Sequence, residues 1–134
     1  MSAIINHSYF DFFTIAIEAY NSQNKNIYRK LMITLISTYK ALINEIELSS
    51  SYLDKTEKLH YLENELETFY DNMYDSMDII KLYKKRLEEL KNQDGLFADL
   101  YEVIDKLYLV MIEHLDRVST LEVKSIQQKY AKVS

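Results

Sequence analysis

The residues of this sequence best able to do chemistry are three polar side chains that interrupt apolar helical patterns, Tyr28, Ser76 and His114. Ser76 and His114 stand in apolar ladders with 3-4 spacing, and Met73 and Met111 are their expected neighbours. A buried imidazole beside methionines could act as an acid, a base or a haem ligand. His114 has no carboxylate on its own helix face to orient the ring, which acid–base work requires. We therefore predict that Tyr28, Ser76 and His114 form a structural polar layer that fixes the helix register, with a hydroxyl bonded to the imidazole.

Three short motifs have the spacing of metal ligands. Glu57-x-x-His60 resembles one step of a di-iron bundle, but such a site needs a second Glu-x-x-His step and the sequence has none. Asp75-x-x-Asp78 with Glu102-x-x-Asp105 resembles the paired acidic motifs of all-helical nucleotide pyrophosphohydrolases of the MazG kind, which hold magnesium with them. That resemblance covers four residues and implies a magnesium-dependent hydrolase as an alternative function. In the register predicted below the two pairs face outward in different layers, so we expect no metal site, no cofactor and no enzymatic activity.

Composition indicates that helices position all of these residues. The 134 residues include no proline, no cysteine and one glycine, with 48% apolar and 28% charged residues. Because the residues that build tight turns between strands are missing, we predict an all-α fold, and the length fits one domain spanning residues 1–134. The sequence has no basic secretory signal and no apolar stretch long enough to span a bilayer, so we expect a soluble, cytoplasmic protein.

Two apolar ladders predict a long antiparallel coiled-coil hairpin. One ladder runs from Leu59 to Leu90 and the other from Phe97 to Leu121, and the segment 92–95 between them holds the only glycine. A turn there brings Leu90 opposite Phe97 and continues the pairing along both ladders. We predict helices at about 52–92 and 95–129, preceded by shorter helices at about 9–21 and 25–48, in an antiparallel four-helix bundle.

The predicted register leaves the tip of this hairpin uncovered. Pairing the helix 25–48 with the helix 52–92 puts Tyr39 opposite Leu62 and Tyr28 opposite Met73. The two shorter helices would then reach only part of the hairpin, and its tip, about 79–108, would project by ~20 Å. Exposed apolar surface of that extent is typical of interfaces, and tyrosines are enriched at binding hot spots. The predicted interaction residues are Tyr83, Leu87, Leu90, Phe97, Tyr101 and Tyr108.

Charge is divided along the chain, whose net charge is -5. Residues 54–78 carry eight acids against two bases, a net of -6, and residues 79–92 carry five bases against two acids, a net of +3. Acids early and bases late in one helix complement the helix dipole, and they also suit antiparallel pairing with a second copy. The short basic run faces acids on the neighbouring helix, so we expect neither nucleic acid nor a membrane as a partner.

These features favour a non-enzymatic protein–protein interaction module that binds another protein and forms a homodimer. Small acidic helical proteins of this kind include regulators, inhibitors, immunity proteins, antitoxins and chaperones. Heavy use of Ile, Asn, Lys and Tyr is typical of AT-rich bacterial, phage or viral genomes, so a structural or assembly subunit of a phage or virus is the other alternative.

Overall fold

The computed structural model describes residues 7–55 and 66–133, which form four α-helices. They are α1 (His7–Asn21), α2 (Lys25–Lys55), α3 (Leu66–Leu90) and α4 (Gly95–Val133). Within those ranges there is no β-strand, and the four helices pack together. The expectation of an all-α bundle is therefore confirmed, and none of the described helices is both long and apolar enough to cross a membrane.

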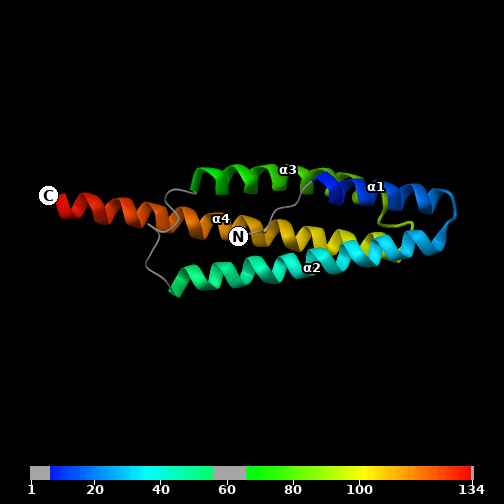
Figure 1. The fold of residues 1–134 in the computed structure, drawn as a ribbon, viewed down its shortest axis with the longest axis horizontal. Coiled ribbons are helices and arrows are strands. Elements are labelled where there is room, and N and C mark those ends of the chain that lie inside the picture. The colour runs from blue at the N-terminus through cyan, green and yellow to red at the C-terminus, as the bar shows by residue number, and fades with distance from the viewer. Residues whose placement is uncertain (1–6, 56–65, 134) are drawn as a thin grey trace.

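The bundle consists of two helical hairpins, α1–α2 and α3–α4, whose turns lie at the same end of the molecule (Figure 1). We call this the turn end. The helix α4 packs against α2, which runs in the same direction, and against α3, which runs in the opposite direction. The helix α1 packs mainly against α2 and meets α3 at only a few points. The four helices thus form a ring with one open side, between α1 and α3.

The turn between α1 and α2 is a Schellman motif built without glycine. The backbone N–H of Asn24 donates to the carbonyl of Ala19, and that of Gln23 donates to the carbonyl of Tyr20. Gln23 occupies the left-handed position that glycine usually fills, with φ of 62°. Asn24 then caps α2, because its Oδ1 accepts a hydrogen bond from the backbone N–H of Ile27 at 3.4 Å.

The turn between α3 and α4 depends on an aspartate more than on the glycine beside it. Asp94 accepts a hydrogen bond from the backbone N–H of Leu96 at 3.1 Å, which caps the start of α4. Its Oδ2 also accepts a hydrogen bond from the hydroxyl of Tyr28 at 2.6 Å. Gly95 does not have a positive φ, so the turn does not use the freedom of glycine. The turn predicted at residues 92–95 is confirmed.

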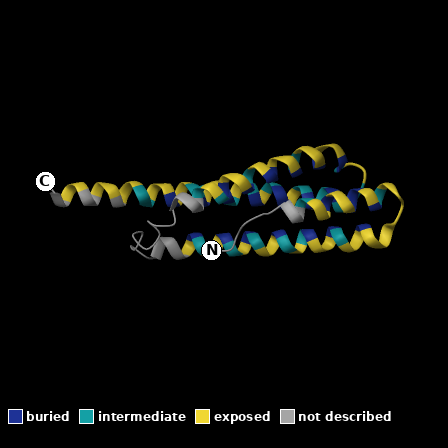
Figure 2. Cartoon of the chain, turned by 45° about the horizontal axis from the view of Figure 1, so that its top comes forward, coloured by how far each residue is buried: buried dark blue, intermediate teal, exposed yellow. Residues whose placement is uncertain are grey.

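The core follows the predicted ladders of the second hairpin. The ladder positions from Met73 to Leu90 and from Phe97 to Val118 are all buried (Figure 2). Lys84 binds Asp105 at 2.9 Å, and Tyr70 donates to Glu122 at 2.8 Å, as the predicted antiparallel pairing requires. The largest fully buried side chains come from all four helices and include Phe13, Met32, Leu35, Tyr39, Ile46, Ile80, Tyr83, Leu87, Phe97 and Leu100.

The first hairpin docks on the second in a different register from the predicted one. The Tyr39 hydroxyl donates to the Tyr83 hydroxyl at 2.6 Å, and Tyr83 lies 21 residues beyond the expected partner Leu62. A displacement of 21 residues is three heptads, so the same face of α2 is turned to the core, but α2 packs mainly on α1 and α4 and not side by side with α3 as predicted. The prediction was wrong because heptad spacing fixes which face of a helix is buried but repeats every seven residues.

As a result, the hairpin tip does not project beyond the other helices. Tyr20 and Tyr28 pack on Phe97 with ring centroids 5.0 and 5.2 Å away, and the Tyr20 hydroxyl donates to the carbonyl of Gln93 at 3.2 Å. The first hairpin therefore covers the predicted tip. The part that does extend past the other helices is the C-terminal end of α4 (Figure 1).

Two predicted helix boundaries were also wrong. The helix α2 continues through Ser49, Ser50 and Ser51 to Lys55, where we expected a break and a new capping box. Ser50 is buried and faces the core, so packing overrides the usual preference of serine for helix ends. The helix α3 is continuous from Leu66 to Leu90, and the predicted stretch at 56–65 lies outside the described residues.

Candidate interaction surface

Two of the three residues predicted to form a polar layer are among the buried polar side chains of the bundle. Ser76 and His114 are buried, at 0% and 2% exposure. The partner of the imidazole is Ser50, whose Oγ lies within hydrogen-bond reach of His114 Nδ1. Tyr28, which we expected here, lies at the turn end of the bundle, because the register of α2 is displaced by three heptads. The available signal for Ser50 was that it continues the 3-4 spacing of Ile43 and Ile46.

The surroundings of His114 keep its ring neutral. Burial, and to a smaller extent the positive charge of Arg117, lower the pKa of His114 to about 4. Ser50 is only 8% exposed, so a substrate could reach the Ser50–His114 pair only if the helices separated. A serine hydroxyl beside a histidine can be a nucleophile with its base, but this pair is closed to solvent and is suited to positioning α2 against α4.

Four of the six predicted interaction residues belong to the core. Tyr83, Leu87 and Phe97 are fully buried and Leu90 is 5% exposed. The Tyr83 ring packs against Phe10 and Phe13 of α1, with centroids 5.1 and 4.9 Å away. The expectation that these four residues form a free contact surface was wrong because α1 and α2 lie over them.

The other two, Tyr101 and Tyr108, lie half-buried on the flank of α4. Lys91 lies over the Tyr101 ring at 4.7 Å from its centroid, and Lys84 lies over the Tyr108 ring at 5.1 Å. Both lysines come from α3, so these rings already hold the two helices of the hairpin together. Contact of Tyr101 and Tyr108 with a partner stays a prediction.

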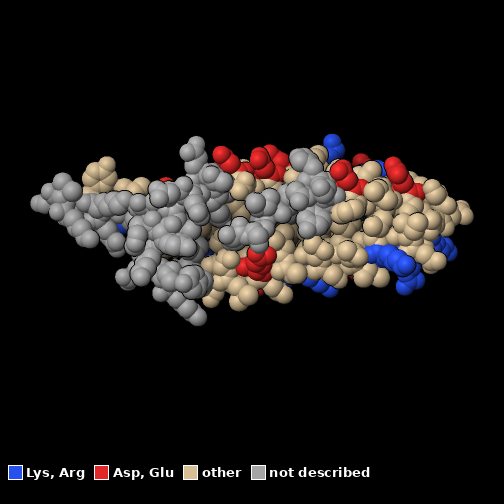
Figure 3. Space-filling view, in the orientation of Figure 1, with Lys and Arg blue, Asp and Glu red and all other residues tan. Residues whose placement is uncertain are grey.

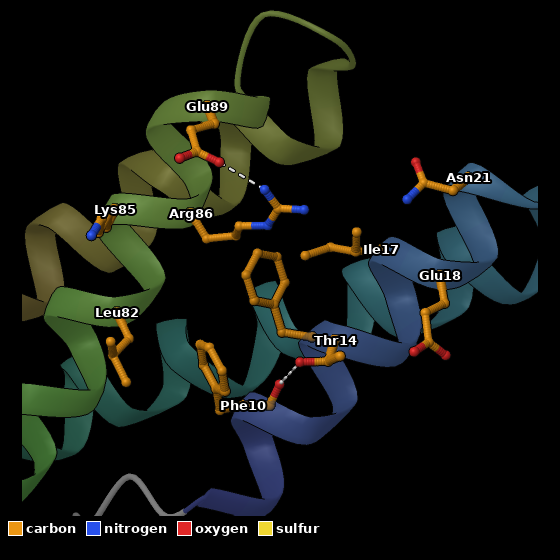
Figure 4. Close-up of a pocket in the computed structure, with 10 residues that line it drawn as sticks. Phe10, Thr14, Ile17, Glu18, Asn21, Leu82, Lys85, Arg86 and Glu89 are labelled. Atoms are coloured by element: carbon orange, nitrogen blue, oxygen red, sulfur yellow. Dashed lines mark hydrogen bonds and ion pairs between the residues drawn. The ribbon is translucent and has the colours of Figure 1, made fainter.

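A groove of about 550 Å³ runs along the open side of the helix ring, between α1 and α3. Its lining is mainly apolar, with Phe10, Phe13 and Ile17 from α1 and Leu82 from α3 (Figure 4). Arg86 extends from α3 into the groove and binds Glu89 at 2.7 Å (Figure 4). The groove exists because α1 packs on α2 and leaves its other flank without a neighbouring helix.

The outward face of α3 borders this groove and has a ladder of its own. Its members are exposed and follow 4-3-4-3-4 spacing, in the order Asp71, Asp75, Asp78, Leu82, Lys85 and Glu89. Tyr74 and Leu82 on this face are 57% and 51% exposed. Acidic side chains gather along the edge formed by α3 and α1 in Figure 3. We call the exposed residues 71–89 of α3 the α3 outer face.

The charges at the centre of the α3 outer face are not used inside the chain. In the described ranges the ion pairs are Lys84 with Asp105, Arg86 with Glu89, and Lys91 with Glu88. The acids at 71, 75 and 78 and the lysines at 81 and 85 take part in none of these pairs. Contacts within the described chain therefore do not explain why acids and bases are separated along this face.

The structure describes part of the predicted metal motifs. Glu57 and His60 lie outside the described residues. Of the acidic pairs, Asp105 binds Lys84, and in the described part of the chain no three His, Asp or Glu side chains are grouped as metal ligands.

Together the packing and the outward surfaces define an all-α protein of two docked helical hairpins. No protein-family model, curated protein or solved structure matches this chain.

Proposed function

We propose that this protein is a non-enzymatic interaction module, of the small regulator, inhibitor, immunity, antitoxin or chaperone type, that binds protein through the open side between α1 and α3. The observation that carries the proposal is the apolar groove of about 550 Å³ in a ring of four helices that lacks a neighbour on one side. A helix bound there would bury Leu82 and the half-buried Phe10 and complete the ring.

The distribution of polar groups supports this function over catalysis. The side chains with nucleophile or base chemistry at Ser50 and His114 are buried in the bundle. The groove has an apolar floor and an exposed rim that is mostly polar and charged, with Leu82 as its exposed apolar side chain, and an apolar centre with a polar rim is the usual composition of a protein contact surface.

The test compares two exposed leucines. Leu82 at the groove is 51% exposed and Leu109 on α4 is 54% exposed, so both tolerate a charge without loss of the core. We expect Leu82→Asp to weaken protein binding at least tenfold, since a carboxylate would be desolvated in an apolar contact, whereas Leu109→Asp keeps wild-type binding. Binding is measured as oligomeric mass by light scattering and as proteins captured from a lysate of the source organism. Equal self-association and equal capture by both variants would contradict the proposal.

A second candidate function is that of an assembly subunit, because α4 has another exposed apolar stripe. Val123, Ile126 and Tyr130, spaced at i, i+3 and i+7, are 52%, 46% and 73% exposed in the C-terminal part of α4. A subunit that binds its neighbours through two different surfaces forms open filaments or closed rings. Light scattering separates the two candidates, since assembly gives masses well above that of a dimer.

A further inference from the structure

We infer that the occupant of the open side is a second copy of this chain, whose α3 lies antiparallel to the first along the α3 outer face. This inference rests on the proposed function and names the partner and the geometry of its binding surface. The two copies would be related by a two-fold axis that passes near residues 78–82, so each copy contributes the same residues to the contact.

Charge selects this orientation. The N-terminal half of the α3 outer face carries Asp71, Asp75 and Asp78, and the C-terminal half carries Lys81, Lys85 and Arg86. In an antiparallel pair about this axis Asp75 of each copy comes opposite Lys85 of the other, which is attractive, whereas Asp71 comes opposite Glu89 at the ends. The attraction therefore lies in the central part of the contact. A parallel pair would put acids against acids and bases against bases, which costs free energy.

The apolar residues of the same face lie where an antiparallel copy would cover them. Leu82 is close to the expected two-fold axis, so the two copies of Leu82 come near each other at the centre of the contact. Leu82 also lines the groove, together with Phe10 and Ile17. A second α3 seated beside α1 would therefore remove the exposed Leu82 and the half-buried Phe10 from water in one step.

The length of the surface is sufficient for a stable helix pair. The residues from Asp71 to Glu89 span five steps of 3-4 spacing, which is ~27 Å of helix at a rise of 1.5 Å per residue. The pairing of complementary charges at fixed spacing is how helices choose a partner and an orientation. A helix of a different protein, with its own acids and bases arranged in this order, is the competing occupant that the experiment excludes or reveals.

The experiment uses two variants of the full chain, called single-sign variants because one charge sign dominates the α3 outer face of each. Lys81→Glu with Lys85→Glu leaves Arg86 as the base of this face, and Asp75→Lys with Asp78→Lys leaves the acids Asp71, Glu88 and Glu89. We expect each variant alone to dimerise at least tenfold more weakly than the wild type, and an equimolar mixture to form a heterodimer of at least wild-type affinity. Light scattering with one mass-labelled variant measures both results. The wild-type dimer should weaken as salt is raised, because the contact includes exposed ion pairs.

The control keeps the change in net charge and moves it to another helix. Lys25→Glu with Lys40→Glu alters two exposed lysines of α2 and should leave the dimer mass unchanged. Circular dichroism checks that every variant has wild-type helix content. The inference is overturned if single-sign variants keep the wild-type dimer mass, or if their mixture stays monomeric. A wild-type chain that is monomeric at every concentration, yet loses a captured protein on Leu82→Asp, would overturn this inference and leave the proposed function intact.

Discussion

The two ends of the bundle are held together by different means. At the turn end all four helices meet, and the rings of Tyr20, Tyr28 and Phe97 form a cluster. The hydroxyls of Tyr20 and Tyr28, in the first hairpin, donate hydrogen bonds to Gln93 and Asp94 of the second hairpin. At the far end three helices meet around a polar contact between Ser50 and His114. The first end is held by a cluster of aromatic rings with two hydrogen bonds, and the second by the buried Ser50–His114 contact and the hydrogen bond of Tyr70 to Glu122.

The difference shows which contacts choose the register. An apolar ladder accepts any shift of seven residues, because leucine facing leucine has nearly the same free energy in each register. The bonds of Tyr28 to Asp94 and of Tyr39 to Tyr83 exist in only one register. Polar and aromatic contacts at specific positions therefore determine how the hairpins dock, while the ladders supply most of the buried apolar area.

The largest expected effect comes from removing the centre of the aromatic cluster. We expect Phe97→Ala to lower the free energy of unfolding by about 3–5 kcal/mol, because a fully buried ring is lost and a cavity remains. The matched change at the far end, Val118→Ala, should cost only about 2 kcal/mol, since it removes two methyl groups. Urea denaturation of both variants measures the difference. Equal losses would mean that the turn end is not the more strongly specified end.

The stability of the far end should depend on pH through His114. The pKa of His114 falls from its ordinary 6.5 to about 4 on folding, so the unfolded chain takes up this proton first as pH decreases. The stability contributed by His114 is complete above pH 6.5 and is lost between pH 6.5 and about 4, to a total of about 3 kcal/mol. Denaturation of the wild type and of His114→Leu across this range measures the effect as a difference. We expect the variant to have the flatter profile, and parallel profiles would show that His114 does not take part.

The smallest effect concerns the turn of the first hairpin. Gln23 has a left-handed backbone, which costs less for glycine, so we expect Gln23→Gly to raise the melting temperature, with a gain of about 0.5–1 kcal/mol. The neighbouring change Asn24→Ala removes the cap of α2 and should cost about 1 kcal/mol. Thermal unfolding followed by circular dichroism compares them. A loss of stability in Gln23→Gly would mean that the glutamine side chain itself supports the turn.

Sequence patterns were enough to predict the second hairpin and its buried residues. The ladders through Ile80 and Leu107 and the turn at residues 92–95 follow from local spacing alone. Such spacing can be interpreted within a single pair of helices that are adjacent in the chain. The docking of α1 and α2 could not be predicted because it depends on which of several equivalent heptads is used. The register could have been suggested by Tyr39 and Tyr83, because a buried tyrosine hydroxyl needs a hydrogen-bond partner and these two hydroxyls bind each other.

The candidate surface was predicted only in part. The division of charge along α3 was visible in the sequence, but the groove beside it was not, since the groove depends on which flank α1 leaves open. Ser50 was missed because a cluster of three serines has the composition of a helix end.

The meeting of both turns at one end also has a consequence for folding kinetics. Each hairpin joins helices that are adjacent in the chain, so its contacts close over short loops and form early. The bonds between hairpins join residues far apart in sequence, with separations of 73 for Tyr20 to Gln93 and 66 for Tyr28 to Asp94. We therefore expect the encounter of the two hairpins to limit the folding rate, and the bonds of Tyr20 and Tyr28 to form in that step.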